Sequence, residues 1–292
     1  MNDLSYEARA KGALGREDFR FSHRLGQNFI MDDNVVDEIA ACSGAQAGDA
    51  VLEIGPGAGT LTAALVRRGA RVMAVEVDKN LEPVLKSLLG ENENVHLKFG
   101  DILKCDLNEL HEELSGMRAE GGALRVAANL PYYITSDVLT RFAKSDAEFD
   151  SLTIMVQREA AERIMARVGQ KQYCLLSALL EWHYDIEAAM ELPRTLFTPP
   201  PHVDSTLLRL TPKAAPAQID DIDTLHKTMS AAFLMRRKTM LNNLSAAFSL
   251  SRDEAAQVLE DAGLNKNVRG EALTQNELAA LSNAVHAHLN RS

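Results

Sequence analysis

Cysteine is scarce in this sequence, and long apolar runs are missing from it. The 292 residues include three cysteines, Cys42, Cys105 and Cys174, which stand too far apart for the close pairs of a zinc site or a disulfide framework. No stretch approaches the roughly 20 apolar residues that a membrane-spanning helix needs, and residues 1–20 lack the apolar core of a secretory signal. We therefore expect a cytoplasmic protein that binds neither a membrane nor a metal.

Basic residues are also in the minority. Lysine and arginine number 31 against 41 aspartates and glutamates, a formal net charge of −10, which by itself argues against a nucleic-acid partner. The basic residues gather in three groups, however: Lys227, Arg236, Arg237 and Lys238 in the acid-free stretch 224–251; Arg163, Arg167 and Lys171, at the spacing of one helical stripe; and Arg9, Lys11, Arg16, Arg20 and Arg24. Any one group fits a solvated helix face equally well, but three of them in an acidic protein favour a selective basic surface.

Short β-rich runs alternate with helical patterns from about residue 48. The expected strands are 50–54, 71–77, 95–99, 124–128, 151–156, a weaker 183–190, and 206–210, with helices such as 61–68 and 136–142 between them. This alternation predicts an α/β fold with a mostly parallel, doubly wound sheet.

The sequence changes character after Leu210. We expect a linker at 211–217, and only helical signals follow it. Gly263 suits the end of a helix, and two pairs have the spacing of capping boxes, Ser251 with Glu254 and Thr274 with Glu277. The sequence therefore predicts a first domain over 1–212, with an N-terminal extension at 1–23, and a small all-α domain over 213–292.

A glycine-rich segment joins the first expected strand to a helix. Gly55, Gly57 and Gly59 let the backbone turn tightly and approach a ligand closely. Their G-x-G-x-G spacing differs from the G-x-G-x-x-G of dinucleotide sites, and Glu53 at the entrance of the loop would repel a pyrophosphate. Both details favour a nucleoside that carries a cationic sulfonium.

Acidic residues follow the next two strands. Glu76 stands 21 residues after Gly55, where a carboxylate can bind both ribose hydroxyls. Asp101 follows the third strand, where it can accept a hydrogen bond from the adenine amine. Either acid alone is more typical of a solvated strand end, but ligands bind at the carboxyl ends of such strands. Together with the glycine loop, the two acids predict a site for S-adenosylmethionine.

The fourth strand leads into Asn129-Leu130-Pro131-Tyr132. The N6 amine of adenine is a weak nucleophile because its lone pair is delocalised into the ring, and acceptors for its N–H groups make it richer in electrons. The Asn129 side-chain oxygen and the Leu130 carbonyl are suitable acceptors, Pro131 stiffens the turn, and Tyr132 offers a face to an extruded base. An isolated segment of this kind is more typical of a β-turn. After a nucleoside site, we interpret it as the catalytic group of an adenine N6 methyltransferase.

These residues occur together in one family. Over nearly its whole length the chain resembles the small-subunit rRNA adenine N6-dimethyltransferases, known from kasugamycin resistance in bacteria. The resemblance is carried by Leu25–Phe29, Glu53–Gly59, Glu76, Asp101, Asn129–Tyr132, Gln157–Glu159, Phe197–Ser205 and a helical Arg236–Thr239. It implies a Rossmann-like class I methyltransferase domain with a seven-stranded sheet. It also implies a monomer that uses S-adenosylmethionine, releases S-adenosylhomocysteine and dimethylates two adjacent adenosines in the 3′-terminal hairpin loop of 16S rRNA, in the immature 30S subunit.

The resemblance also implies roles for single residues. Those that bind the cofactor would be Asn28, Ile30, Gly55, Gly57, Glu76, Asp101, Ile102 and Asn129. Phe197 matches the family's aromatic residue on the opposite side of the target base from Tyr132, although a core position fits it as well. Arg236, Arg237 and Lys238 would contact the RNA. The sequence departs from many relatives at Cys174, where they have glycine, and in the length of the segment before Arg24.

Four other functions share parts of this pattern. A large-subunit rRNA methyltransferase of the macrolide-resistance type is disfavoured by the segments Phe197–Ser205 and Arg236–Thr239. A DNA adenine methyltransferase usually has proline where Leu130 stands. A non-catalytic assembly factor of the same fold has no need of Asn129 and the acids, and a nicotinamide-dependent dehydrogenase is disfavoured by the spacing of the glycine loop.

Overall fold

The chain divides into two compact units in the computed structural model, which describes residues 5–16, 19–90 and 92–291, without the side chains of Arg16 and His23. One unit comprises Met1–Ala161 and Asp185–Pro212, and the other comprises Glu162–Tyr184 and Lys213–Ser292. The boundary after Pro212 coincides with the predicted division. Residues 162–184 do not follow that division, since they group with the helices that come after residue 212.

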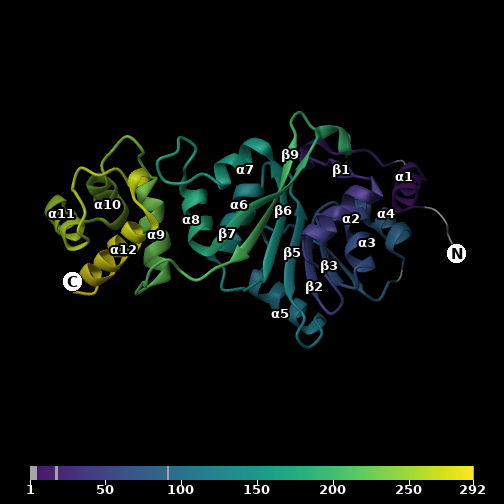
Figure 1. The fold of residues 1–292 in the computed structure, drawn as a ribbon, viewed down its shortest axis with the longest axis horizontal. Coiled ribbons are helices and arrows are strands. Elements are labelled where there is room, and N and C mark those ends of the chain that lie inside the picture. The colour runs from purple at the N-terminus through teal and green to yellow at the C-terminus, as the bar shows by residue number, and fades with distance from the viewer. Residues whose placement is uncertain (1–4, 17–18, 91, 292) are drawn as a thin grey trace. The chain divides into compact units, whose positions relative to one another are not determined.

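A seven-stranded sheet forms the first unit (Figure 1), with the strand order β4-β3-β2-β5-β6-β9-β7. The strands are β2 (Ala50–Ile54), β3 (Arg71–Glu76), β4 (Val95–Phe99), β5 (Leu124–Asn129), β6 (Ser151–Gln157), β7 (Tyr184–Leu192) and β9 (Ser205–Pro212). The first five pair in parallel, and β9 runs antiparallel to β6. The predicted parallel sheet and all seven expected strands are therefore confirmed.

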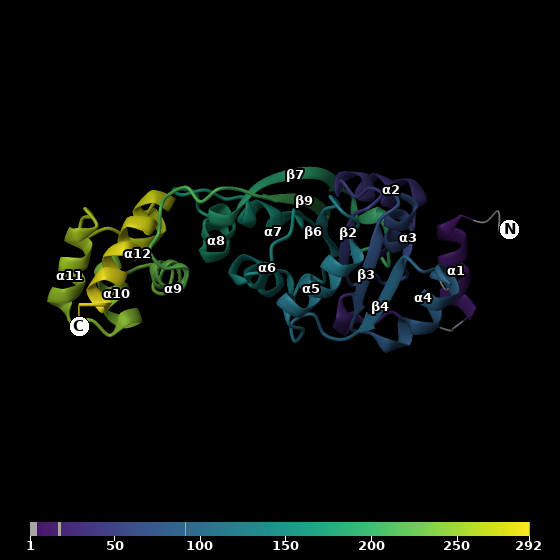
Figure 2. The same cartoon turned by 90° about the horizontal axis from the view of Figure 1, so that it is seen from below.

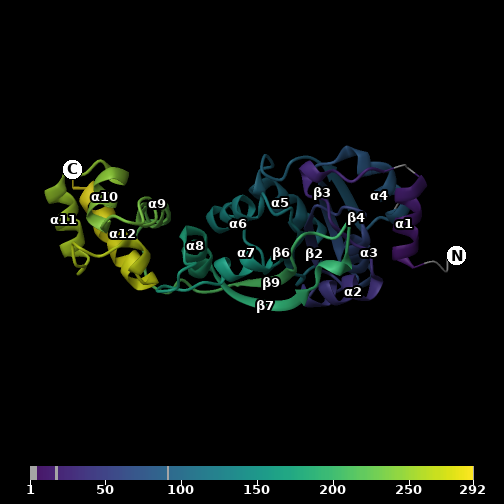
Figure 3. The ribbon, with the colours of Figure 1, turned by 90° about the horizontal axis from the view of Figure 1, so that it is seen from above.

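Helices cover both faces of this sheet (Figures 2 and 3). The helices α2 (Asp33–Cys42) and α3 (Thr60–Arg67) pack together on one face, and α5 (Leu107–Met117) and α6 (Thr135–Lys144) lie on the other. Every residue of β2 is buried as a result, which explains why this strand is a nearly continuous apolar run. The carboxylates of Asp32 and Asp106 accept backbone N–H groups in the first turns of α2 and α5, and so fix where these helices begin.

The N-terminal extension contains a helix, α1 (Tyr6–Arg16), that packs against α4 (Glu82–Leu89). The Arg9 guanidinium donates to the Leu88 carbonyl at 2.6 Å, and Lys11 pairs with Glu7 at 2.5 Å. Two members of the N-terminal basic group are thus engaged within the chain, while the side chain of Arg16 lies outside the described residues. Further on, β1 (Phe29–Ile30) forms a separate two-stranded ladder with β8 (Phe197–Thr198).

The second unit is helical, as expected for residues 213–292. Its elements are the end of α7 (Arg158–Ile164), then α8 (Leu175–His183), α9 (Ile222–Ala232), α10 (Met240–Phe248), α11 (Arg252–Asp261) and α12 (Gln275–Leu289). Both predicted capping boxes form, at the starts of α11 and α12, and Gly263 follows α11 with a φ of 69°. Among the described helices, none has the length and hydropathy to cross a membrane.

Two helical predictions for basic residues were wrong. Helix α7 ends at Ile164, and the chain then turns through Gly169, whose φ is 86°, so Arg167 and Lys171 do not continue a helical stripe from Arg163. Arg167 instead pairs with Glu181 at 3.3 Å. The segment 236–239 lies in the turn between α9 and α10, because α9 ends at Ala232.

Helices α8 and α9 meet at a histidine pair within the second unit. The Nε2 atoms of His183 and His226 lie 3.1 Å apart, so one ring donates a hydrogen bond to the other. Burial lowers the pKa of His183 to about 4, with a smaller contribution from His226, so the His183 ring is neutral at pH 7. Cys174 stands just before α8 with an extended backbone, φ −148°, which cysteine adopts as readily as glycine.

Candidate active site

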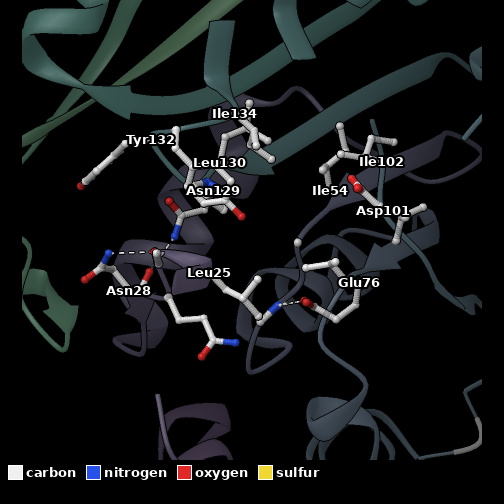
Figure 4. A pocket seen from close by; sticks show the side chains of 18 of the residues that line it. Leu25, Asn28, Ile54, Glu76, Asp101, Ile102, Asn129, Leu130, Tyr132 and Ile134 are labelled. Atoms are coloured by element: carbon white, nitrogen blue, oxygen red, sulfur yellow. Dashed lines mark hydrogen bonds between the residues drawn. The ribbon is translucent and has the colours of Figure 1, made fainter. Parts of the chain in front are cut away.

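A cavity of about 510 Å³ lies in the first unit at the carboxyl ends of β2, β3, β4 and β5 (Figure 4). This volume is within the usual range for small-molecule sites, and this edge is where open α/β sheets bind their ligands. The lining residues are 24–29, Ile54, Gly55, Gly57, 75–77, Leu81, 100–103 and 129–134. The cavity thus brings together the glycine loop, both acids and the tetrapeptide that the sequence singles out.

The glycine loop keeps one wall of the cavity free of side chains. Gly55 has a φ of 70°, and a Cβ added to it would meet no atom nearer than the Asn129 carbonyl oxygen, at 4.0 Å. Such a Cβ would therefore occupy the cavity itself. Gly57 is needed for a different reason, because its Cβ would come within 2.8 Å of the Phe29 ring. Gly59, with a φ of 84°, precedes the first turn of α3.

Glu76 ends β3 with its carboxylate buried and held by two backbone N–H groups. Its Oε2 atom accepts from Gly57 at 3.2 Å, and its Oε1 atom accepts from Asp78 at 2.8 Å. Burial is the largest influence on this carboxyl and raises its pKa, while the backbone hydrogen bonds oppose that rise. The two contacts fix the orientation of a carboxylate on the cavity wall.

Asp101 and Ile102 follow β4 and line the same cavity. The Oδ1 atom of Asp101 accepts from the Leu103 amide at 3.0 Å, and Oδ2 lies 3.9 Å from the ammonium group of Lys104. Ile102 is buried, with 6% of its surface exposed. In Figure 4 the Asp101 and Glu76 side chains lie on the same side of the cavity, away from Asn129 and Tyr132.

Asn129 is the last residue of β5, and its side-chain amide is tied to the loop before β1. The Nδ2 atom donates to the Asn28 carbonyl at 2.9 Å. The Asn28 side chain in turn donates to the Gly26 carbonyl at 2.9 Å. The contact with Asn28 fixes the orientation of the amide, and its oxygen, the only acceptor of the group, can accept a hydrogen bond from a ligand.

Leu130, Pro131 and Tyr132 complete the predicted tetrapeptide on the cavity wall. Leu130 is buried, and the Pro131 carbonyl accepts from the Ile134 amide at 3.1 Å, which closes the turn into α6. The Tyr132 hydroxyl lies 3.3 Å from the Ser205 hydroxyl at the start of β9. Burial raises the pKa of Tyr132, so the phenol is neutral and its half-buried ring is available for stacking.

Glu53 does not stand at the entrance of the large cavity, as its place in the sequence suggests. Its side chain is 1% exposed and lines a smaller adjoining cavity, together with Ile30, Gly55 and Gly57. Burial raises the pKa of Glu53 to about 8, with an opposing influence of the nearby Thr62 hydroxyl and a smaller rise from Glu76. The Oε2 atom is buried without a hydrogen-bond partner among the described residues.

Two residues expected beside the ligands lie elsewhere in the first unit. Ile30 is buried and lines the smaller cavity, while Phe197 is 3% exposed and lines neither cavity. Phe197 pairs with Ile30 across β1 and β8, and its ring belongs to a core cluster with Val36 and Leu207. The Phe197 ring is packed in the core in this structure, and its predicted place opposite Tyr132 stays a prediction.

The predicted RNA-contacting residues Arg236, Arg237 and Lys238 lie in the second unit and are all exposed. Arg236 pairs with Glu271 at 2.8 Å, which offsets its charge. The three basic residues do not line the cavity, and their contact with RNA stays a prediction.

Gln27, Val77 and Tyr133 are among the lining residues to which sequence reasoning gave no specific role. Gln27 accepts from the Ser22 amide and donates to Asp78, at 2.7 Å each, and so connects the segment before β1 to the end of β3. Its position inside the Leu25–Phe29 motif was the available signal. Val77 and Tyr133 line the cavity while 48% and 60% exposed, and only the fold could show this.

Known proteins resemble the chain over most of its length. Residues 18–283 match the family model described as ribosomal RNA adenine dimethylase. A relative from Clostridioides difficile (strain 630), named ribosomal RNA small subunit methyltransferase A, is 37% identical over 287 residues, which cover 98% of each chain.

Two solved structures are similar in fold. One is a dimethyladenosine transferase from Plasmodium falciparum, with 23% identity and a TM-score of 0.68 over 86% of this chain and 94% of that one. The other is the 23S rRNA methyltransferase ErmE, with 22% identity and a TM-score of 0.61 over 89% of this chain and 100% of that one. These likenesses confirm the Rossmann-like class I methyltransferase fold. With a family match over most of its residues and a full-length relative at 37% identity, the chain belongs to the ribosomal RNA adenine dimethylase family.

Proposed function

We propose that this chain is a methyltransferase that dimethylates adenine N6 in small-subunit rRNA. The observation that carries the proposal is the Asn129 amide, which is held by the Asn28 carbonyl in the same cavity that contains Glu76 and Asp101. An oriented amide oxygen beside a nucleoside-sized cavity suits an enzyme that acts on an exocyclic amine.

The cavity residues fit S-adenosylmethionine as the cofactor. Gly55 leaves room for a ligand against the backbone, the fixed Glu76 carboxylate suits the ribose hydroxyls, and Asp101 suits the adenine amine. Burial raises the pKa of Glu53 to about 8, so its carboxyl is neutral at pH 7, and its unpartnered oxygen in the adjoining cavity suits a ligand that forms a hydrogen bond. When bound, S-adenosylmethionine supplies an electrophilic methyl group on a cationic sulfur.

Asn129 and Tyr132 would hold the target base. The Asn129 oxygen accepts a hydrogen bond from the adenine amine, and the Leu130 carbonyl accepts a second one. Both contacts withdraw the nitrogen lone pair from the ring and aim it into the cavity. Stacking on the Tyr132 ring offsets part of the cost of taking the base out of the RNA. Much of the rate then comes from alignment of the reacting groups, since the methylated nitrogen is acidic enough to release its proton to water.

The relatives' name supports small-subunit rRNA as the target. We propose two adjacent adenosines of the 3′-terminal hairpin loop of 16S rRNA as the substrate, presented by the immature 30S subunit to a cytoplasmic monomer. Arg237 and Lys238, which are exposed, would meet RNA phosphates. The likeness to ErmE shows the fold alone, so a large-subunit target is the alternative that the experiment must exclude.

The test is transfer of labelled methyl groups from S-adenosylmethionine to undermethylated 30S subunits and, in parallel, to 23S rRNA. We expect dimethyladenosine in 16S rRNA, no label in 23S rRNA, and almost no transfer by Asn129→Ala. Label confined to 23S rRNA would make the large-subunit alternative correct. Mass spectrometry of 16S rRNA from cells that lack the gene gives the same answer in vivo, as loss of dimethyladenosine at both positions.

A further inference from the structure

Tyr133 follows the tetrapeptide and exposes a large aromatic ring beside the cavity. Among the described residues, six large apolar side chains are exposed, and Tyr133, at 60%, is exposed the most. Two of the six, Tyr133 and Val77, line the candidate active-site cavity. Single exposed apolar residues need no explanation, but two at the mouth of one cavity indicate a surface that is covered when a ligand binds.

The backbone that carries this ring is firmly held. Tyr133 lies in the turn that the Ile134 amide closes on the Pro131 carbonyl at 3.1 Å. Its ring lies beside Gly26, where an added Cβ would come 3.3 Å from the Pro131 Cβ atom and 3.8 Å from the Tyr133 Cε1 atom. Within the described part of the chain, the ring makes no contact with another aromatic ring. A flat, positioned and exposed face is thus presented next to Tyr132.

Nucleic-acid chemistry supplies a ligand for such a face. A base that leaves its stack to enter an active site deprives its neighbour of a stacking partner. An aromatic side chain at the mouth of the site restores that partner, and a base stacked on an aromatic ring typically contributes enough to change affinity about 5- to 150-fold. Tyr132 and Tyr133 are consecutive in the chain, as the target and the flanking base are consecutive in the RNA.

We propose that the Tyr133 ring stacks on the base next to the target adenosine and so positions the RNA strand. This inference rests on the proposed function. Where two adjacent adenosines are the targets, the ring would hold one of them while the other occupies the cavity. Tyr133 is then a positioning residue whose effect falls on the RNA and not on the cofactor.

The first experiment compares wild type, Tyr133→Phe and Tyr133→Ala on small subunits reconstituted with 16S rRNA that lacks one base, on either the 5′ or the 3′ side of the target. On intact RNA we expect Tyr133→Ala to lower kcat/KM about 10-fold, mainly through KM, and Tyr133→Phe to match wild type. On the RNA that lacks the stacked base, the kcat/KM of wild type should fall to that of Tyr133→Ala. The kcat/KM of Tyr133→Ala should be the same on this RNA as on intact RNA. Stacking would be contradicted if Tyr133→Ala had the same loss of kcat/KM relative to wild type on every RNA. It would also be contradicted if the variant lost affinity for S-adenosylhomocysteine by a similar factor.

A second measurement does not require methyl transfer. An RNA hairpin with 2-aminopurine in place of the flanking base should lose fluorescence when wild type or Tyr133→Phe binds, and lose much less with Tyr133→Ala. Quenching that depends on Tyr133 in a protein that transfers no methyl group would leave this inference standing and remove the proposed function. Methyl transfer together with equal quenching by all three proteins would leave the proposed function standing and remove this inference.

Discussion

The Nδ2 atom of Asn129 donates a hydrogen bond to the carbonyl oxygen of Asn28 at 2.9 Å. This bond connects the end of β5 to the loop before β1 and determines which end of the amide faces a ligand. An aspartate at position 129 would have no proton to donate to that carbonyl. The catalytic side chain is therefore oriented by backbone that lies 101 positions earlier in the chain.

Replacement of Asn129 by alanine should nearly abolish methyl transfer. The variant loses an acceptor for the adenine amine, and loss of one such preorganised contact costs roughly 10²- to 10³-fold in kcat. Asn129→Asp should also lose activity, because its carboxylate repels the Asn28 carbonyl. Single-turnover assays measure the rate, and circular dichroism checks that both variants fold. Normal turnover by Asn129→Ala would remove the role given to this side chain.

Replacement of Glu76 by glutamine should weaken cofactor binding about 10- to 100-fold. The carboxylate accepts from Gly57 and Asp78, so an amide nitrogen at either oxygen position would face a backbone N–H, and hydrogen bonds to charged groups contribute about 1.5 to 3 kcal/mol. Calorimetry with S-adenosylhomocysteine measures the affinity. Glu82→Gln, in an exposed pair with Lys86, is the matched control. Equal affinities of Glu76→Gln and Glu82→Gln for S-adenosylhomocysteine would contradict the role of Glu76 in cofactor binding.

Glu53 should make the protein less stable as the pH rises. Its pKa in the folded chain is about 8 against an ordinary value of 4.5, so the folded state binds the proton more tightly than the unfolded state does. The stability that the neutral form contributes is complete below about pH 4.5 and is lost between there and pH 8. Glu53→Gln removes this dependence, and by pH 8 the variant should gain roughly 3 to 5 kcal/mol relative to wild type. Urea denaturation without cofactor measures the free energy of unfolding at each pH. Parallel pH profiles of this free energy for wild type and Glu53→Gln would contradict the prediction.

His183 should make the second unit less stable as the pH falls. Its pKa is lowered from 6.5 to about 4 in the folded chain, so the unfolded state takes up the proton first. The stability that the neutral ring contributes is present above pH 6.5 and is lost on the way down to pH 4, by about 2 kcal/mol after allowance for partial exposure. His183→Gln should flatten the profile over this interval. Hydrogen exchange in α8 and α9 measures the effect, and an unchanged acid profile in the variant would rule it out.

The exposed cations of the turn between α9 and α10 differ in their expected effect on RNA binding. Arg237→Gln and Lys238→Gln should each reduce the slope of log K against log salt by about 1. Arg236→Gln should change it less, since Arg236 is paired with Glu271. Filter binding to small subunits across salt concentrations measures the slopes. Three unchanged slopes would place the RNA contact elsewhere.

The sequence predicts the sheet and the strand ends well because burial and ligand chemistry both leave local traces there. The apolar run of β2, the glycines after it, and the acids after β3 and β4 are each visible within a few residues. Phe197 leaves no such trace, since its environment depends on pairing with the distant Ile30. Arg167 and Lys171 have helical spacing, but α7 ends at Ile164 and the chain turns through Gly169, which lies between them. The burial of Glu53 leaves no local signal in the sequence, because an acid in a short strand looks the same whether it faces water or the core.

The two-residue ladder of β1 and β8 joins Ile30 to Phe197 and Phe29 to Thr198. Phe29 lines the candidate cavity, and Phe197 is buried in the core. The ladder pairs the amino-terminal segment with the segment that precedes β9. Removal of the chain up to and including Met31 would remove this pairing. A shortened protein would therefore lose a wall of the cavity and at the same time expose the Phe197 ring.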